Sequence, residues 1–286
     1  IRVKLVTGSS DVCSSDLNIT PLGTDLPELR QARALWQLNR FDEALALFGQ
    51  AVRKCPGNCL ALTDASRAFG ARFEIARAEE LLDRLIKLGG RNPQILHLAG
   101  QSYRMIFRPE KAMDCFRRAL SLTRNLPDTQ LELALFCERR HRLEEAFSLI
   151  EDCLRVEPGY HAAELVKARL LRRMKDEAGA ETILRRLAEG GQAHPLICGQ
   201  AWSEIAQLLD RHGQYEEAMQ AALRWKEIMR RDEAPVLRES EGVLRHLSDL
   251  ADSVTAAHFH RWAEAAHGFP PGRTAVLAGL DRKSVV

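Results

Sequence analysis

Small apolar, large apolar and charged residues return along most of this chain in a fixed order. The clearest marker is an alanine that recurs every 34 residues, at Ala44, Ala78, Ala112, Ala146 and Ala180. Similar residues surround it, as in Phe41-Asp42-Glu43-Ala44 and Leu143-Glu144-Glu145-Ala146, and a sixth copy at Tyr215-Glu216-Glu217-Ala218 comes four residues late. A constant period of this size predicts a stack of similar structural units.

Each unit is expected to be a helix, a tight turn and a second helix. With units beginning at Asp25, Cys59, Pro93, Pro127 and His161, the third unit places Leu96, Ala99, Gly100, Tyr103, Ala112, Phe116 and Ala119 at positions 4, 7, 8, 11, 20, 24 and 27. Small residues at positions 8 and 20 allow the two helices to approach, and large residues at 4, 11 and 24 fill the space between units. One unit cannot bury its apolar face alone, so several must stack.

This order of residues resembles the tetratricopeptide repeat over roughly residues 25–230. The resemblance implies an all-α fold, a right-handed α-solenoid of about six repeats with C-terminal capping helices. The second and fifth units fit less closely, and Leu82 and Leu85 replace the usual Phe and Ala. A longer turn at residues 190–198 is expected to absorb the four-residue delay, and the helical spacing of residues 236–266 predicts the caps.

The chain is therefore divided into four predicted segments. Residues 1–17 have no helical period and resemble translated adapter sequence, as do the last six residues; a native disordered tail is the alternative. Residues 18–230 are the predicted array, 231–268 the capping or spacer helices, and 269–286 the start of a truncated α/β domain plus a non-native tail. Within the last segment, the apolar run 274–280 follows a Pro-Pro-Gly turn and is the predicted first strand.

A second resemblance depends on that ending. A repeat array, a helical spacer and then Arg273-Thr274-Ala275-Val276-Leu277-Ala278-Gly279-Leu280 is similar to the bacterial sulfotransferases that contain tetratricopeptide repeats. In that family the strand leads into a Pro-Arg-Ser-Gly-Thr-Thr loop that holds phosphoadenylyl sulfate. Here Asp281-Arg282-Lys283 stand in its place, so the resemblance implies the cofactor for an intact parent and none for this fragment.

Composition adds few constraints. Hydrophobic residues make up 45% and charged residues 28%, and the net charge is +2, which gives no general attraction to nucleic acid or membrane. Seven cysteines with no dense disulfide spacing favour a reduced, cytoplasmic protein, because Cys137 and Cys153 fall on core positions. Cys55 and Cys59 form a single pair without a second one, which argues against a metal site.

The candidate binding residues lie on the first helix of each unit, which is expected to line a concave groove. Positions 9 and 12 hold a partly basic line, made of Arg33, Arg67, Gln101, Arg104, Arg169 and Arg172. Guanidinium groups suit an acidic peptide or a chain carboxylate. The alternative is that these arginines only keep an exposed helix face soluble. The expected partner is a protein or peptide segment in the groove, with no nucleic acid, membrane or metal.

Two functions remain open at this point. The first is a protein- or peptide-binding scaffold that serves as the substrate-presenting arm of a larger sulfotransferase. The alternative is a free-standing tetratricopeptide adaptor with no link to sulfotransfer. The fragment itself is not expected to be an enzyme, because its repeats contain no Ser/His/Asp set, Gly-rich phosphate loop or metal-binding helix motif.

Overall fold

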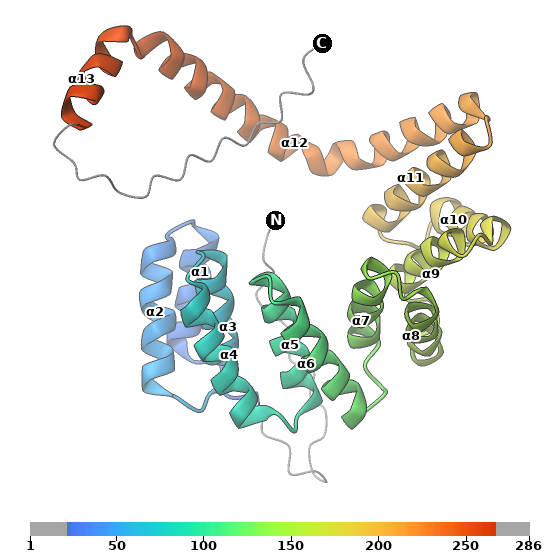
Figure 1. The fold of residues 1–286 in the computed structure, drawn as a ribbon, viewed down its shortest axis with the longest axis horizontal. Coiled ribbons are helices and arrows are strands. Elements are labelled where there is room, and N and C mark those ends of the chain that lie inside the picture. Colours follow the sequence, from blue (N-terminus) through green and yellow to red (C-terminus); the bar gives the residue numbers. More distant parts are fainter. Residues whose placement is uncertain (1–21, 267–286) are drawn as a thin grey trace. The chain divides into compact units, whose positions relative to one another are not determined.

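The computed structural model of the protein describes residues 22–266, and this part of the chain contains thirteen α-helices and no strand (Figure 1). The first helices are α1 Pro27–Gln37, α2 Phe41–Lys54, α3 Cys59–Ala71, α4 Ile75–Gly89, α5 Pro93–Met105 and α6 Pro109–Leu122. They are followed by α7 Pro127–Arg139, α8 Leu143–Val156, α9 His161–Arg173, α10 Glu177–Glu189, α11 Pro195–Arg211, α12 Tyr215–Ser253 and α13 Ala256–Ala266. The chain divides into two compact units after Lys226.

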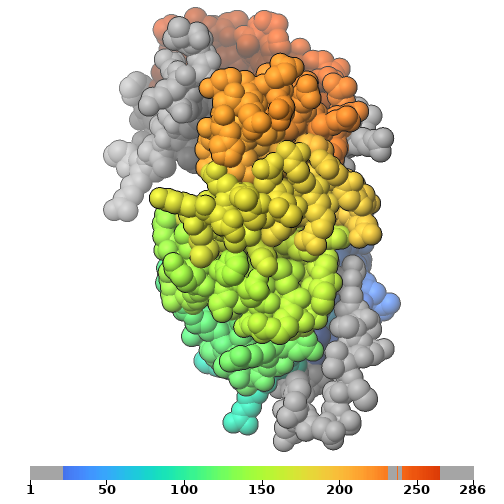
Figure 2. All heavy atoms as spheres, turned by 90° about the vertical axis from the view of Figure 1, so that its right-hand side faces the viewer, coloured from blue at the N-terminus to red at the C-terminus, as the bar shows by residue number. Residues whose placement is uncertain are grey.

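The first unit is a stack of six helix pairs, here called repeats 1 to 6. In repeats 2 to 5 the first helix begins at the residue predicted for the unit, whereas in repeat 1 it begins at Pro27, two residues after Asp25. Positions in repeat 6 are counted from Gly199, so that Ala218 is at position 20. Figure 2 shows successive repeats as adjoining layers, from the green α7–α8 to the yellow α9–α10. The two helices of every pair are joined by a turn in which the residue at position 15 of the repeat has a positive φ. These residues are Asn39, Phe73, Phe107, His141, Lys175 and Gly213. The same backbone turn therefore recurs in all six repeats, and the predicted fold class, an all-α solenoid, is confirmed.

The repeating alanines are part of the core of the array. Ala44, Ala78, Ala112, Ala146 and Ala180 are fully buried, and Ala218 of the sixth repeat is nearly so. In repeat 3, Gly100 faces the ring of Phe116, and a Cβ atom added to this glycine would lie 2.5 Å from Phe116 Cε1. Close contact with the second helix therefore requires a small residue at position 8 of this repeat, and the alanines at position 20 are buried, in agreement with the prediction from the sequence.

The four-residue delay before repeat 6 is absorbed by a helix and not by a long turn. The turn between α10 and α11 covers only residues 190–194, and α11 begins at Pro195. This helix has 17 residues, whereas the first helices of repeats 2 to 5 have 13 each. The predicted turn at residues 190–198 is thus wrong in its second half, because proline at the first helical position starts an extra helical turn.

The second unit contains the rest of α12, followed by α13. Because α12 is continuous over 39 residues, the predicted boundary between array and caps at residue 230 falls inside one helix. Several apolar side chains of this unit are exposed, namely Leu237, Val243, Leu244, Leu247, Leu250, Phe259 and Trp262. Their assignment as caps stays a prediction. The predicted leader at 1–17 and the segment 269–286 with its strand at 274–280 lie outside the described residues.

Candidate functional site

The six predicted groove residues lie on the first helices of repeats 1, 2, 3 and 5. We call this set the A-helix row: Arg33 on α1, Arg67 on α3, Gln101 and Arg104 on α5, and Arg169 and Arg172 on α9. The structure brings Arg67 and Gln101 together directly, because Arg67 Nη2 donates to Gln101 Oε1 at 2.8 Å. The other four are each paired with a side chain of a neighbouring repeat.

Three of these pairs follow one rule. An arginine at position 9 or 12 of an odd-numbered repeat contacts a carboxylate at position 6 of the next repeat. Arg33 donates to Asp64 Oδ2 from Nε at 2.7 Å and lies 2.6 Å from it through Nη2. The corresponding distance is 3.4 Å from Arg104 Nε to Glu132 and 2.8 Å from Arg172 Nη1 to Glu204. The pairs therefore join repeat 1 to 2, 3 to 4, and 5 to 6.

The two remaining joints use other polar contacts. Between repeats 2 and 3, the buried Arg67 also donates from Nε to Ser102 Oγ at 3.2 Å. Between repeats 4 and 5, Arg173 Nη1 donates to the main-chain carbonyl of Glu138 at 2.9 Å, and Arg169 lies 4.0 Å from the Glu138 carboxylate. Every joint in the array is thus bridged by polar groups of first helices, and these arginines hold repeats together.

The charge on this face is nearly balanced. Its cations are Arg33, Arg67, Arg104, Arg169, Arg172 and Arg173, and the carboxylates beside them are Asp25, Asp64, Glu132, Glu138 and Glu204. Burial raises the pKa of the Asp64 carboxyl in spite of the Arg33 guanidinium beside it, and burial likewise raises the pKa of Glu132. The basic line read from positions 9 and 12 is therefore largely neutralised by the acids at position 6.

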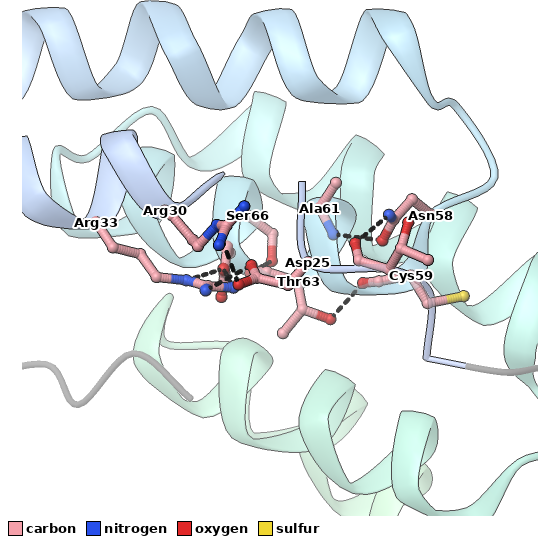
Figure 3. A network of polar contacts seen from close by, with 10 residues as sticks. Asp25, Arg30, Arg33, Asn58, Cys59, Ala61, Thr63 and Ser66 are labelled. Carbon is pink, nitrogen blue, oxygen red and sulfur yellow. Dashed lines mark hydrogen bonds and ion pairs between the residues drawn. The ribbon is translucent and has the colours of Figure 1, made fainter. Parts of the chain in front are cut away.

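A non-helical segment of the chain itself lies at the start of this row (Figure 3). The Asn58 side chain donates from Nδ2 to the Thr24 carbonyl at 2.8 Å, and the Leu60 N–H donates to the Leu22 carbonyl at 2.7 Å. Asn58 also caps α3, because its Oδ1 accepts from the Ala61 N–H at 3.1 Å. Asp25 then pairs with Arg33 at 2.8 Å. Main-chain carbonyls and one carboxylate of a peptide segment are thus held at the joint of repeats 1 and 2.

Gly23 explains how closely this segment approaches. Its φ of +101° lies in the region that favours glycine, and a Cβ atom there would collide with the Asn58 carboxamide. The main chain can therefore approach the Asn58 side chain this closely only because residue 23 is a glycine.

The two cysteines predicted to lie in the core do so. Cys137 and Cys153 are buried free thiols, and burial raises the pKa of each to about 11. Among residues 22–266, no group of three or more His, Cys, Asp or Glu side chains could hold a metal ion. Over the same residues, no helix is both long and apolar enough to cross a membrane.

Sequence reasoning missed the partners of the row. Asp64, Glu132 and Glu204 share position 6, and this recurrence could have been read from the sequence together with the arginines at positions 9 and 12. The contacts of Leu22 and Thr24 with α3 had no such signal, because they involve main-chain carbonyls, which every residue has.

These features define a solenoid of tetratricopeptide repeats. Two segments, residues 29–69 and 93–126, match family models described as tetratricopeptide repeat. No curated protein matches the chain.

Several solved structures share the fold. The structure described as Pseudomonas aeruginosa pilF is 18% identical, with a TM-score of 0.57 over 70% of this chain and 90% of that one. PilW, a type IV pilus biogenesis factor, is 16% identical, with a TM-score of 0.55 over 71% of this chain and 90% of that one. BtubC from P. vanneervenii is 15% identical, with a TM-score of 0.55 over 73% and 94%. At these identities the likeness shows the fold alone.

Proposed function

We propose that the repeat array is a protein-binding scaffold that holds a peptide segment of its partner along the A-helix row. The observation that carries this proposal is the segment Leu22–Asp25, whose carbonyls and carboxylate are bound by Asn58, Leu60 and Arg33. A peptide from another protein offers the same groups, because main-chain carbonyls are present in every sequence and carboxylates in many. Tetratricopeptide arrays commonly serve as surfaces for partner proteins, and extended concave surfaces are typical of stacked repeats.

The side chains of the row differ in how available they are to a ligand. Arg67 and Asp64 are buried, and their contacts hold the joints. Arg104 is 45% exposed, and its distance of 3.4 Å to Glu132 is longer than those of the equivalent pairs of Arg33 and Arg172. Its guanidinium can therefore exchange this carboxylate for one of a ligand at little cost. We therefore assign the contact with a peptide carboxylate to Arg104, at the middle of the row. Near-neutral charge along the row favours a ligand with one or two carboxylates over a strongly acidic one.

Peptide display tests this proposal. A library of random dodecapeptides would be selected against the full chain, and the enriched peptides would then be titrated against the wild type and Arg104→Ala. A lost charge-assisted hydrogen bond should weaken binding about 10-fold. Arg155→Ala is the matched control, because Arg155 is an exposed arginine on the second helix α8 and lies outside the row. Circular dichroism would check that both variants remain helical.

Two results would contradict the assignment. If the enriched peptides bind Arg104→Ala as tightly as the wild type, the row does not carry the contact. Equal weakening by Arg155→Ala would mean that binding follows total charge and not this face.

We further propose that the array is the substrate-presenting arm of a sulfotransferase, with a free-standing adaptor as the alternative. The support is the run Arg273–Leu280 after a repeat array and a helical spacer, which lies outside the described residues. Sequencing the source DNA beyond the codon for Leu280 tests it. A reading of Pro-Arg-Ser-Gly-Thr-Thr is expected, whereas a genuine Asp281–Val286 followed by a stop codon would leave the adaptor.

A further inference from the structure

The loops that join repeat 2 to repeat 3 and repeat 3 to repeat 4 carry cations that no side chain neutralises. Most lysines and arginines of the array are held by an ion pair, a hydrogen bond or an aromatic ring, as Lys111 and Arg77 are. Within the part of the chain that the structure describes, Lys87, Arg91 and Arg124 have none of these contacts, and all three are exposed. Their charges are therefore available to another molecule.

Two of these cations stand on either side of a glycine. Lys87 lies in the last turn of α4, and Arg91 follows Gly90, the C-cap residue of that helix. Arg118 of α6 reaches the same glycine, because a Cβ atom added there would lie 3.1 Å from the Nη2 atom of Arg118. Three cations are thus within one helical turn of Gly90 along the chain or in contact with it.

Arg124 brings a fourth cation on the neighbouring loop. It lies two residues before Leu126, which packs with Leu96 of α5 and Ala119 of α6 in a small core. Gln130 Nε2 donates to the main-chain carbonyl of Arg124 at 3.2 Å, which fixes this loop to the start of α7. The two loops are therefore neighbours on one edge of the array.

Acidic side chains are scarce along these loops. Arg118 has a long ion pair with Asp114, at 3.5 Å, and the Asp114 side chain is 64% exposed. An exposed pair of this kind contributes little and exchanges easily. The sequence shows the same surplus of positive charge, because no Asp or Glu occurs between Asp83 and Glu110 or between Asp114 and Asp128.

Two leucines add an apolar component between the charges. Leu88 and Leu122 both stand at position 30, near the C-terminal ends of α4 and α6, and they are 42% and 49% exposed. We call the set formed by these leucines and the four cations the basic edge: Lys87, Leu88, Arg91, Arg118, Leu122 and Arg124.

The loops on either side of the basic edge differ from it. Position 30 of repeat 1 is Lys54, which pairs with Glu28 at 2.7 Å. Position 30 of repeat 4 is the apolar Val156, but the acidic Glu157 follows it directly. Exposed apolar side chains are thus combined with unpaired cations at two successive loops and not at their neighbours.

We propose that the basic edge binds a short acidic segment of a partner protein. A carboxylate accepts two parallel hydrogen bonds from a guanidinium group, and three of the four cations are arginines. Apolar residues between the carboxylates of the segment would contact Leu88 and Leu122. This proposal does not depend on peptide binding by the A-helix row.

The extent of the basic edge favours a short segment over a larger anionic surface. A membrane of uniform negative charge would also meet Glu157 at the next loop, whereas a short segment can end before it. A nucleic acid would find no aromatic ring to stack on among the six residues of the edge.

The contact is expected to be weak and sensitive to salt. Exposed ion pairs contribute little each, so a peptide with several carboxylates should bind with a Kd of about 0.1–1 mM at low salt. Added salt should weaken the binding, because the screening length falls from about 10 Å at 0.1 M to about 3 Å at 1 M.

Fluorescence anisotropy with the full chain tests the proposal. The probe is a fluorescein-labelled Glu-Glu-Leu-Glu-Glu-Leu-Glu-Glu peptide, and the same peptide with glutamine in place of glutamate is its control. The wild type should bind the acidic peptide and not the glutamine peptide. Arg91→Gln/Arg124→Gln should weaken the binding about 5- to 10-fold, because it removes two exposed charge contacts. Its melting temperature should equal that of the wild type, since neither side chain contacts the rest of the described chain through an ion pair or hydrogen bond.

Arg53→Gln/Lys175→Gln is the matched control, because it removes two exposed cations that likewise have no ion pair within the described residues and lie outside the basic edge. This variant should bind the acidic peptide like the wild type. The proposal is overturned if both variants weaken binding equally, since binding would then follow total charge. It is also overturned if the wild type does not bind the acidic peptide or binds the glutamine peptide as tightly. Binding to phosphatidylserine vesicles that is lost in Arg91→Gln/Arg124→Gln, without binding of the acidic peptide, would assign the edge to a membrane surface instead.

Discussion

Gly100 offers the sharpest test of the packing that defines the array. In Gly100→Ala, the new Cβ atom would lie 2.5 Å from Cε1, 2.7 Å from Cδ1 and 2.9 Å from Cζ of Phe116. The ring cannot turn away easily, because it is fully buried and its centroid lies 5.8 Å from the His97 ring and 6.1 Å from the Phe136 ring. Repeat 1 accommodates Ala32 with Phe48 at the same two positions, so rotation of this ring determines the result.

Two opposing effects determine how much Gly100→Ala changes the free energy of unfolding. Forcing an extra methyl group into a packed core costs about 1–3 kcal/mol, while replacing glycine by alanine inside a helix gains about 1 kcal/mol. At Gly49, on α2, the new methyl would lie 3.4 and 3.5 Å from the ends of two arginine side chains, which can move. Gly49→Ala should therefore show the gain without the cost. The two variants should differ by about 2 kcal/mol, or about 4–8 °C in melting temperature for an array of this size.

Thermal melts followed by circular dichroism would measure this difference. Midpoints are the quantity to compare, because stacked repeats need not unfold in a single step. In Gly100→Ala/Phe116→Leu, loss of the ring should remove most of the clash, so the two single effects should not add. Equal midpoints for Gly100→Ala and Gly49→Ala would refute the reasoning, since the ring would then move without cost.

Three further predictions concern buried groups. Burial lowers the pKa of His97 to about 4, whereas an unfolded histidine has a pKa of about 6.5. The unfolded state therefore binds more protons, and the free energy of unfolding should fall by up to about 3 kcal/mol as the pH is lowered from about 6.5 to about 4. His97→Asn should flatten this dependence in melts at each pH. Arg67→Ala should lower the free energy of unfolding by about 2–3 kcal/mol in urea titrations, because it removes buried hydrogen bonds, whereas Arg104→Ala should change it by less than about 0.5 kcal/mol. Cys153 should resist alkylation at pH 8 in the native protein while the partly exposed Cys55 reacts, as mass spectrometry would show.

The sequence predicted the stack well because its determinants are local and repeated. The small residues at positions 8 and 20 report close helix contact in any repeat, and the buried Ala44 and Gly100 confirm this. It predicted the sixth repeat too, but assigned the delay before it to a turn. The predicted and observed ends of the turn differ by only a few residues. A proline is compatible with a turn and with the first position of a helix, so the sequence alone did not show that α11 begins at Pro195.

The candidate site was less predictable, because a residue's position on a helix face does not reveal its partner. Arg33 and Arg104 were read as one basic line, yet one holds the buried Asp64 and the other a half-exposed contact with Glu132. Their environments differ because the neighbouring repeat decides which polar atoms lie within reach. The strained Phe73 was not noticed at all, since a positive φ depends on the turn geometry and phenylalanine gives no local signal for it.

Arginines in odd-numbered repeats pair with acids in even-numbered repeats along the A-helix row, so the part of the array that can be exchanged is a pair of repeats. Because carboxylates stand at position 6 only in repeats 2, 4 and 6, a single repeat is not an interchangeable part. Excising residues 59–126 would bring Arg33 opposite Glu132 and restore a pair of the same kind. Excising residues 59–92 would place Leu98 there and leave the guanidinium with Asp25 as its one remaining partner, so the pair across the joint would be lost. Shortened or lengthened versions of this protein should therefore be made by exchanging 68 residues, the length of two repeats.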